Sequence, residues 1–125
     1  MSARAPQPPR QPSAAPSKRV QLARLALEAA LGVDGVVSSH AGPSGTRVTG
    51  TRGERLPGVL ATALPGGRYG IDLHLVTDVV PLPQLADRVR SRAARAASGA
   101  GLGHLLGPVN VTIEDVVLPT EVSER

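Results

Sequence analysis

The stretch that decides the fold runs from Tyr69 to Ala97 and reads YGIDLHLVTDVVPLPQLADRVRSRAARAA. Its first part alternates between two sets of residues, and a period of two places each set on its own face of a β-sheet. One set is largely apolar: Tyr69, Ile71, Leu73, Leu75 and Thr77. The other set is mostly polar: Arg68, Gly70, Asp72, His74 and Val76. The pattern predicts a strand in a sheet that helices cover on one face only.

The second part of the stretch predicts an amphipathic helix that begins after Pro81 and ends near Ala97. Its apolar residues recur at spacings of three and four and therefore share one stripe: Leu82, Leu85, Val89, Ala93 and Ala96. Pro83 suits the first turn of this helix, where a missing N–H costs nothing. We expect the strand and the helix to bury their apolar faces against each other.

The remaining pattern predicts a small α+β domain over residues 18–118. Ser17 can cap the first helix, and Gly32 ends it. The other expected elements are a helix over 18–31, strands over 33–40, 47–51, 58–64 and 109–117, a turn at 41–45 and a loop at 52–56. A helical crossover separates the central strand from the last one, so these two should be parallel neighbours. The expected architecture is a two-layer sandwich, with two helices on one face of a mixed sheet of about four strands.

Composition narrows the possible chemistry. The 125 residues allow at most one domain with tails, and the core must be aliphatic because the chain has no Phe, no Trp and one Tyr. Without Cys, the chain has no disulfide, no thiolate metal site and no thiol nucleophile. No apolar run approaches the roughly 20 residues of a membrane-spanning helix. Arg4 and Arg10 are not followed by the apolar region of a secretory signal, so we expect a cytoplasmic protein without a transmembrane segment of its own.

The formal charge of +4 is concentrated at the N-terminus. The first nineteen residues hold four basic side chains and no acid, whereas the remaining residues hold ten basic and ten acidic side chains. Residues 1–17 are rich in Pro and Ala and predict a disordered basic tail, and residues 119–125 predict a polar C-terminal end. The high isoelectric point therefore does not indicate a basic binding domain.

No catalytic motif follows from residue spacing. The three histidines, His40, His74 and His104, fall in different expected elements and lack the close spacing of metal ligands. The glycines around Gly101 follow a helix rather than a strand, so they do not match a dinucleotide-binding fingerprint. We expect no enzymatic activity, no metal and no cofactor.

The polar face of the central strand is the first candidate site. Asp72 and His74 share this face, and Glu114 on the last strand can lie across from them. The three residues could form a polar, pH-sensitive patch. The commoner explanation of such a pattern is a solvated sheet face, and we expect that one.

The second candidate site is an arginine flank on the second helix. Arg88, Arg92 and Arg95 line one side of the apolar stripe, with only Asp87 nearby in opposition and Arg90 on the far side. An anion, an acidic partner or a lipid headgroup could dock there. The alternative is that the aliphatic stems of these side chains cover the edge of the core.

The order of motifs resembles the alkaline shock protein family of Gram-positive bacteria, particularly its shorter members from high-GC lineages. The resemblance covers about residues 18–118 and rests on ALGVDGVVSSHAG, RLPGV, GIDLHLVTDVVPLPQLADRVRSRAARAA and VNVTIEDV. It implies a small non-enzymatic α+β protein of the envelope and general stress response. It also implies protein partners, namely a small membrane protein that holds the chain at the membrane or further copies of the chain itself.

The expected function is therefore that of a non-catalytic stress response protein. It would act through an exposed sheet edge or through the arginine flank. The alternative is a nucleic-acid-binding accessory protein that uses the basic tail and the same arginines, although the chain has a single aromatic residue, Tyr69, on which single-stranded bases could stack. An enzyme built around Asp72, His74 and Glu114 is the least favoured hypothesis.

Overall fold

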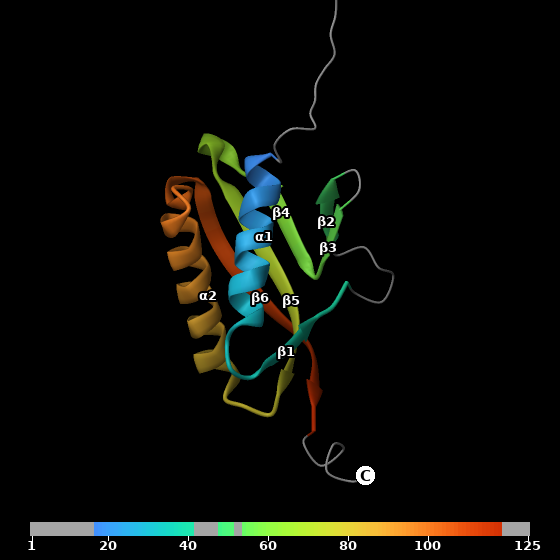
Figure 1. Ribbon diagram of the computed structural model, residues 1–125. Helices are drawn as coiled ribbons and strands as arrows, with labels where there is room; N and C mark the ends of the chain where they lie inside the picture. The colour runs from blue at the N-terminus through green and yellow to red at the C-terminus, as the bar shows by residue number, and fades with distance from the viewer. Residues whose placement is uncertain (1–16, 42–47, 52–53, 119–125) are drawn as a thin grey trace, which may run out of the picture.

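The computed structural model describes residues 17–41, 48–51 and 54–118 (Figure 1). The helices and strands are α1 (Lys18–Leu31), β1 (Val36–Ser39), β2 (Val48–Thr51), β3 (Glu54–Pro57), β4 (Val59–Ala63), β5 (Tyr69–Asp78), α2 (Leu82–Gly99) and β6 (Leu106–Val117). Short 3-10 turns precede β5 and β6, at Pro65–Gly67 and Gly103–Leu105. The predicted α+β fold is confirmed: both helices lie on one face of a four-stranded mixed sheet (Figure 1). The tail predicted over residues 1–17 lies outside the described residues except for Ser17, and so does the predicted C-terminal end.

The central strand of the sheet is β5. Strand β6 pairs with it in parallel over its whole length, as the helical crossover predicts. Strands β1 and β4 therefore follow one another along the other edge of β5, and both are antiparallel to it. The turn at Pro65–Gly67 joins β4 to β5. Every other strand of this sheet thus depends on β5 for its hydrogen bonds.

The two strands that share one edge of β5 meet at His74. The His74 carbonyl accepts a hydrogen bond from His40 N at 2.9 Å, and His74 N donates to the Gly58 carbonyl at 2.8 Å. Gly58 has a φ of +86°, and a Cβ there would lie 2.6 Å from Ser39 Cβ. A larger residue would therefore push β1 and β4 apart.

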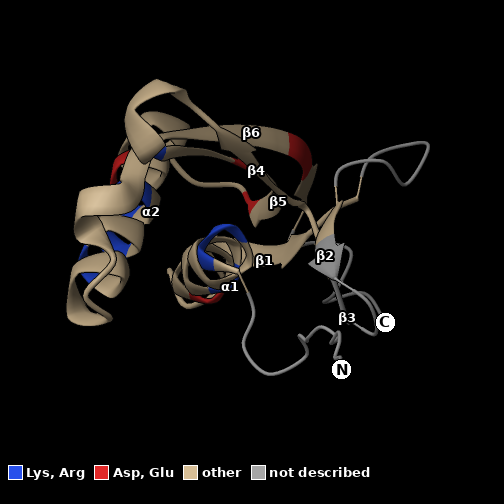
Figure 2. Cartoon of the chain, turned by 90° about the horizontal axis from the view of Figure 1, so that it is seen from above, with Lys and Arg blue, Asp and Glu red and all other residues tan. Residues whose placement is uncertain are grey.

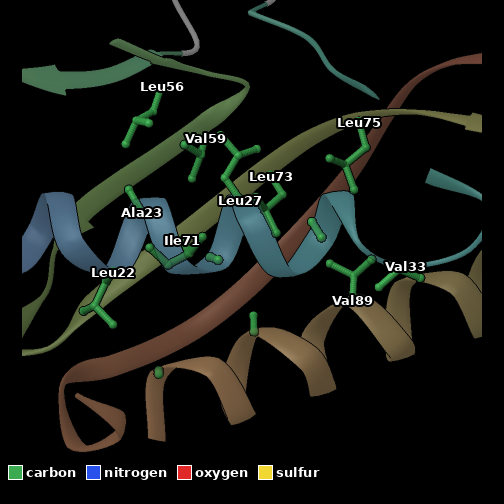
Figure 3. Close-up of a cluster of buried hydrophobic side chains, with 14 of the residues drawn as sticks. Leu22, Ala23, Leu27, Val33, Leu56, Val59, Ile71, Leu73, Leu75 and Val89 are labelled. Atoms are coloured by element: carbon green, nitrogen blue, oxygen red, sulfur yellow. The ribbon is translucent and has the colours of Figure 1, made fainter. Parts of the chain in front are cut away.

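The core fills the space between the sheet and the helices. From β5 it takes Ile71, Leu73 and Leu75, each fully buried, and Val59 joins them from β4 (Figure 3). Helix α2 buries one stripe of apolar residues: Leu85, Val89, Ala93 and Ala97. Helix α1 buries a wider surface: Val20, Leu22, Ala23, Ala26, Leu27 and Ala30. The alanines leave room for the two helices to pack side by side, and Ser17 caps α1 by accepting from Val20 N at 3.2 Å.

The predicted loop at residues 52–56 is wrong, because β3 begins at Glu54 and pairs with β2 as an antiparallel hairpin. Leu56 brings this hairpin into the core at 8% exposure. From β2, Thr49 Oγ1 accepts a hydrogen bond from Ala61 N at 3.1 Å. A four-residue strand has too few residues to show an alternating pattern, so its partner strand and the burial of Leu56 decide its structure.

Candidate functional site

The polar face of β5 holds two separate pairs rather than one cluster. His74 Nδ1 lies 2.7 Å from Glu114 Oε2 on β6. Asn110 Nδ2, also on β6, donates a hydrogen bond to Asp72 Oδ1 at 3.0 Å. The parallel register places Asp72 beside Asn110 and His74 beside Thr112, so both pairs bridge the same two strands. The sequence analysis did not include Asn110 among the candidate site residues, although the alternating pattern of the last strand places it on the polar face.

His74 does not lie on the solvated face that the pattern predicts. Its side chain is 9% exposed, and that of Glu114 is 18% exposed. A polar ring removed from water must keep a hydrogen-bond partner, and the Glu114 carboxylate provides one. The alternating pattern of the strand assigns each side chain to the correct face of the sheet, but it does not show what covers that face. The pair therefore acts as a connection between the central strand and the last strand.

Neither pair offers a site for metal chemistry. Within the described ranges, no three His, Asp or Glu side chains lie close enough together to hold a metal ion. Asp72 is engaged with the Asn110 amide and Glu114 with the His74 ring, so the three candidate residues do not converge on one point. The other two histidines lie elsewhere, with His40 after β1 and His104 in the turn before β6.

The candidate arginine flank lies on the outer side of α2. Arg88, Arg92 and Arg95 are all exposed. Figure 2 shows the positions of the basic residues of α2 spread along the helix ribbon, with few acidic positions near them. Among the described residues, the side chains of these three arginines have no ion pair and no hydrogen bond.

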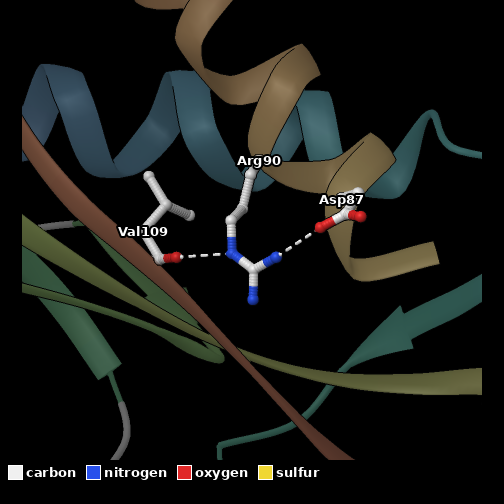
Figure 4. Close-up of polar contacts among 3 residues, drawn as sticks. All are labelled: Asp87, Arg90 and Val109. Atoms are coloured by element: carbon white, nitrogen blue, oxygen red, sulfur yellow. Dashed lines mark hydrogen bonds and ion pairs between the residues drawn. The ribbon is translucent and has the colours of Figure 1, made fainter. Parts of the chain in front are cut away.

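The fourth arginine of α2 behaves differently. Arg90 Nη1 donates to Asp87 Oδ1 at 2.9 Å, and Arg90 Nε donates to the Val109 carbonyl of β6 at 3.1 Å (Figure 4). Asp87 therefore neutralises Arg90 and not the flank. The ion pair is solvent-exposed and is worth at most about 1 kcal/mol, so its main effect is to hold the guanidinium against the strand.

The hydrogen bond from Arg90 to Val109 also affects how open the outer edge of β6 is to a further strand. Within the described part of the sheet, β6 pairs with β5 alone. Pro108 removes one N–H from β6, Arg90 occupies the Val109 carbonyl, and Val116 N donates to Asp115 Oδ1 at 2.9 Å. Prolines and charged side chains on an edge strand hinder the addition of a further strand. The outer edge of β6 is therefore hindered as a binding surface, whereas the arginine flank is exposed.

Of the helices in the described part of the chain, none combines the length and apolar content of a membrane-spanning segment. No protein-family model matches the chain. No curated protein matches it either.

The chain does resemble some solved structures. A variant of MamM CTD aligns at 18% identity and a TM-score of 0.45, covering 79% of this chain and 99% of that one. A nickel form of another MamM CTD variant aligns at 16% identity and a TM-score of 0.43, covering 77% of this chain and 96% of that one.

Proposed function

We propose that the chain is a non-catalytic protein of the alkaline shock type, which acts in the envelope and general stress response by binding another protein in the cytoplasm. The order of its sequence motifs supports the family, and the α+β sandwich agrees with the fold that this resemblance implies. The arginine flank is the observation that supports binding to another protein. Three exposed arginine side chains line one helix without an ion-pair partner among the described residues, whereas the fourth arginine, Arg90, is paired with Asp87.

The spacing of the flank defines the chemistry of the partner. Arg88, Arg92 and Arg95 lie at successive turns, and the row extends about 10 Å along the helix axis. Each planar guanidinium can bind a carboxylate through two parallel hydrogen bonds. The flank therefore suits an acidic segment about two helical turns long. The cytoplasmic end of a small membrane protein could supply such a segment, and it would bring the chain to the membrane without a span of its own.

Neutralising the flank tests this proposal. In the variant Arg88→Gln/Arg92→Gln/Arg95→Gln, we expect at least a tenfold loss of partner after cross-linking in cells, because each charge-assisted hydrogen bond is worth about 1.5–3 kcal/mol. The matched control is Arg4→Gln/Arg10→Gln/Lys18→Gln, which removes the same charge away from α2. Equal recovery from both variants would exclude the flank as the binding surface.

A salt titration with DNA and RNA separates this function from nucleic-acid binding. A protein that contacts several phosphates loses affinity steeply as salt rises, with a slope of about 0.9 per phosphate on duplex DNA. We expect no binding even at low salt, because the chain has a single aromatic residue and its domain has balanced charge. Tight binding with a steep slope that the flank variant abolishes would assign the arginines to nucleic acid instead.

A further inference from the structure

The outer edge of β4 carries backbone groups that no strand of the four-stranded sheet pairs with. Antiparallel pairing turns alternate residues toward the neighbouring strand, and along β4 the even-numbered residues face β5. His74 N donates to the Gly58 carbonyl at 2.8 Å, and Leu64 N donates to the Arg68 carbonyl at 2.8 Å. Within the described part of the chain, this sheet has no strand beyond β4. The residues whose N–H and C=O groups point outward are therefore Val59, Ala61 and Ala63.

This edge lacks the protection that β6 has. Pro108, Arg90 and Asp115 hinder the addition of a strand at β6, whereas β4 reads VLATA and contains no proline and no charge. The cover of the β4 edge is the β2–β3 hairpin, which lies beside β4 and forms a separate two-stranded sheet (Figure 1). From this hairpin, Thr49 Oγ1 accepts a hydrogen bond from the outward-facing N–H of Ala61 at 3.1 Å.

Few side chains attach the hairpin to the domain. Among the residues of β2 and β3 whose burial the structure describes, Thr49 and Leu56 are buried, at 2% and 8% exposure. A two-stranded hairpin is marginally stable by itself in water, so its contacts with α1 and β4 hold it in place. Segments with few buried contacts open locally at a lower free-energy cost than that of global unfolding. The hairpin is therefore the part of the domain that we expect to detach first.

Gly58 fixes the point about which the hairpin can turn. This buried residue joins β3 to β4, and a Cβ there would lie 2.6 Å from Ser39 Cβ and 2.7 Å from His40 N. The close packing, together with the hydrogen bond from His74 N, keeps the start of β4 against β1 and β5 when β3 moves away.

We propose that the β2–β3 hairpin is a gate on the outer edge of β4. It opens about Gly58 while the four-stranded sheet and both helices stay folded. When the gate is closed, Thr49 occupies the N–H of Ala61, and the edge is protected from further strands. When it is open, the outward groups of β4 are free to pair with an extended segment. Opening leaves α2 in place, so the gate is independent of the arginine flank.

Native-state hydrogen exchange tests the gate on adjacent amides of one strand. The amides of Leu60 and Thr62 face β5 and should exchange through global unfolding, whereas that of Ala61 should exchange each time the gate opens. We expect the protection factor of Ala61 to be at least about tenfold lower than those of its two neighbours. Low concentrations of urea should accelerate the neighbours steeply and Ala61 only weakly, because opening the gate exposes little surface. A urea dependence at Ala61 as steep as that of its neighbours would overturn the proposal.

Two variants separate the gate from other motions. Leu85→Ala removes a buried side chain of α2, on the opposite side of α1 from the hairpin, and destabilises the closed and open forms alike (Figure 1). It should accelerate exchange at Leu60 and Thr62 by at least about tenfold and leave Ala61 within about twofold of the wild type. Acceleration of Ala61 in step with its neighbours would mean that the hairpin opens only when the whole domain unfolds, and it would contradict the gate.

Leu56→Ala weakens the attachment of the hairpin itself. It should accelerate exchange at Ala61 by at least about tenfold, because the opened form no longer has to give up the burial of Leu56. An unchanged rate at Ala61 would mean that the Thr49 side chain moves alone, and the hairpin would then not be a gate. If either variant fails to fold, the urea series on the wild-type chain decides between the gate and global unfolding.

Discussion

The two faces of β5 hold the same strand in place by different physical means. Toward the helices, Ile71, Leu73 and Leu75 are fully buried among aliphatic neighbours. Their contribution to the free energy of folding grows with the apolar area removed from water. On the opposite face, Asp72 and His74 each bind one defined partner on β6. The apolar face can accept several arrangements of similar volume, whereas the polar face accepts one.

The two faces of β5 therefore affect different properties of the fold, namely its stability and the register of β6. Shifting β6 by one residue would send its apolar residues to the wrong face, and it would also break both polar pairs. The apolar face thus makes the sandwich stable, and the polar face helps to select the alignment of the two parallel strands.

Removing a side chain from the apolar face should have the largest effect. Leu73→Ala is expected to lower the free energy of unfolding by about 2–5 kcal/mol, because it removes buried methyl groups and leaves a cavity. Urea denaturation measures the loss. Thr62→Ala, an exposed position on β4, is the control and should change the stability by less than about 0.5 kcal/mol. Similar losses for the two variants would show that the helix-covered face does not dominate stability.

Breaking the His74–Glu114 pair should have an intermediate effect. Glu114→Ala leaves a poorly exposed imidazole without this partner, and we expect a loss of about 1–3 kcal/mol. His74→Ala and the double variant complete a thermodynamic cycle, whose coupling free energy should be about 0.5–3 kcal/mol for a pair in direct contact. The more exposed pair Asp72–Asn110 serves as the comparison, with a smaller coupling. Additive effects at His74 and Glu114 would remove the proposed role of the pair in register.

The smallest effect concerns a polar atom on the apolar face. Thr77 is fully buried, and its hydroxyl is the buried side-chain polar atom that lacks a hydrogen-bond partner in the described structure. Thr77→Val keeps the shape and removes the unsatisfied hydroxyl, so it should stabilise the fold by about 1 kcal/mol. The matched control Thr49→Val removes the acceptor of Ala61 N and should destabilise it by about 1–3 kcal/mol. Thermal unfolding of both variants distinguishes them, and destabilisation by Thr77→Val would mean that its hydroxyl has a partner in solution.

The elements that the sequence predicts best are those whose pattern extends over many residues. Helix α1 ends at Leu31 as predicted, and α2 extends two residues beyond the predicted Ala97. The strand expected at 33–40 is shorter, because Gly35 adopts a φ of +100° before β1 begins at Val36. The last strand starts three residues early, at Leu106, where its pairing with Tyr69 and a hydrogen bond from Arg68 extend it. In the last strand the difference arises from contacts with a distant segment, whereas in the first strand it arises from the local backbone at Gly35.

The candidate sites show the same limit. That Arg88, Arg92 and Arg95 share a flank follows from helical spacing alone, and so does the separate position of Arg90. The contact of Arg90 with Val109 could not be foreseen, because it depends on how closely α2 packs beside β6. Likewise, alternation placed Asp72 and His74 on one face, but the partner of each depends on the register of β6.

The sequence by itself determined the periodicity of each long segment, and with it the helices, the central strand and the side of the sheet that the helices cover. Local spacing is sufficient for these features because each arises from neighbours within a few turns or residues. Only the tertiary structure decided the β2–β3 hairpin, the division of Asp72, His74 and Glu114 into separate pairs, and the contact of Arg90 with Val109. These features join segments far apart in the chain, and their energies depend on burial and register that no local pattern contains.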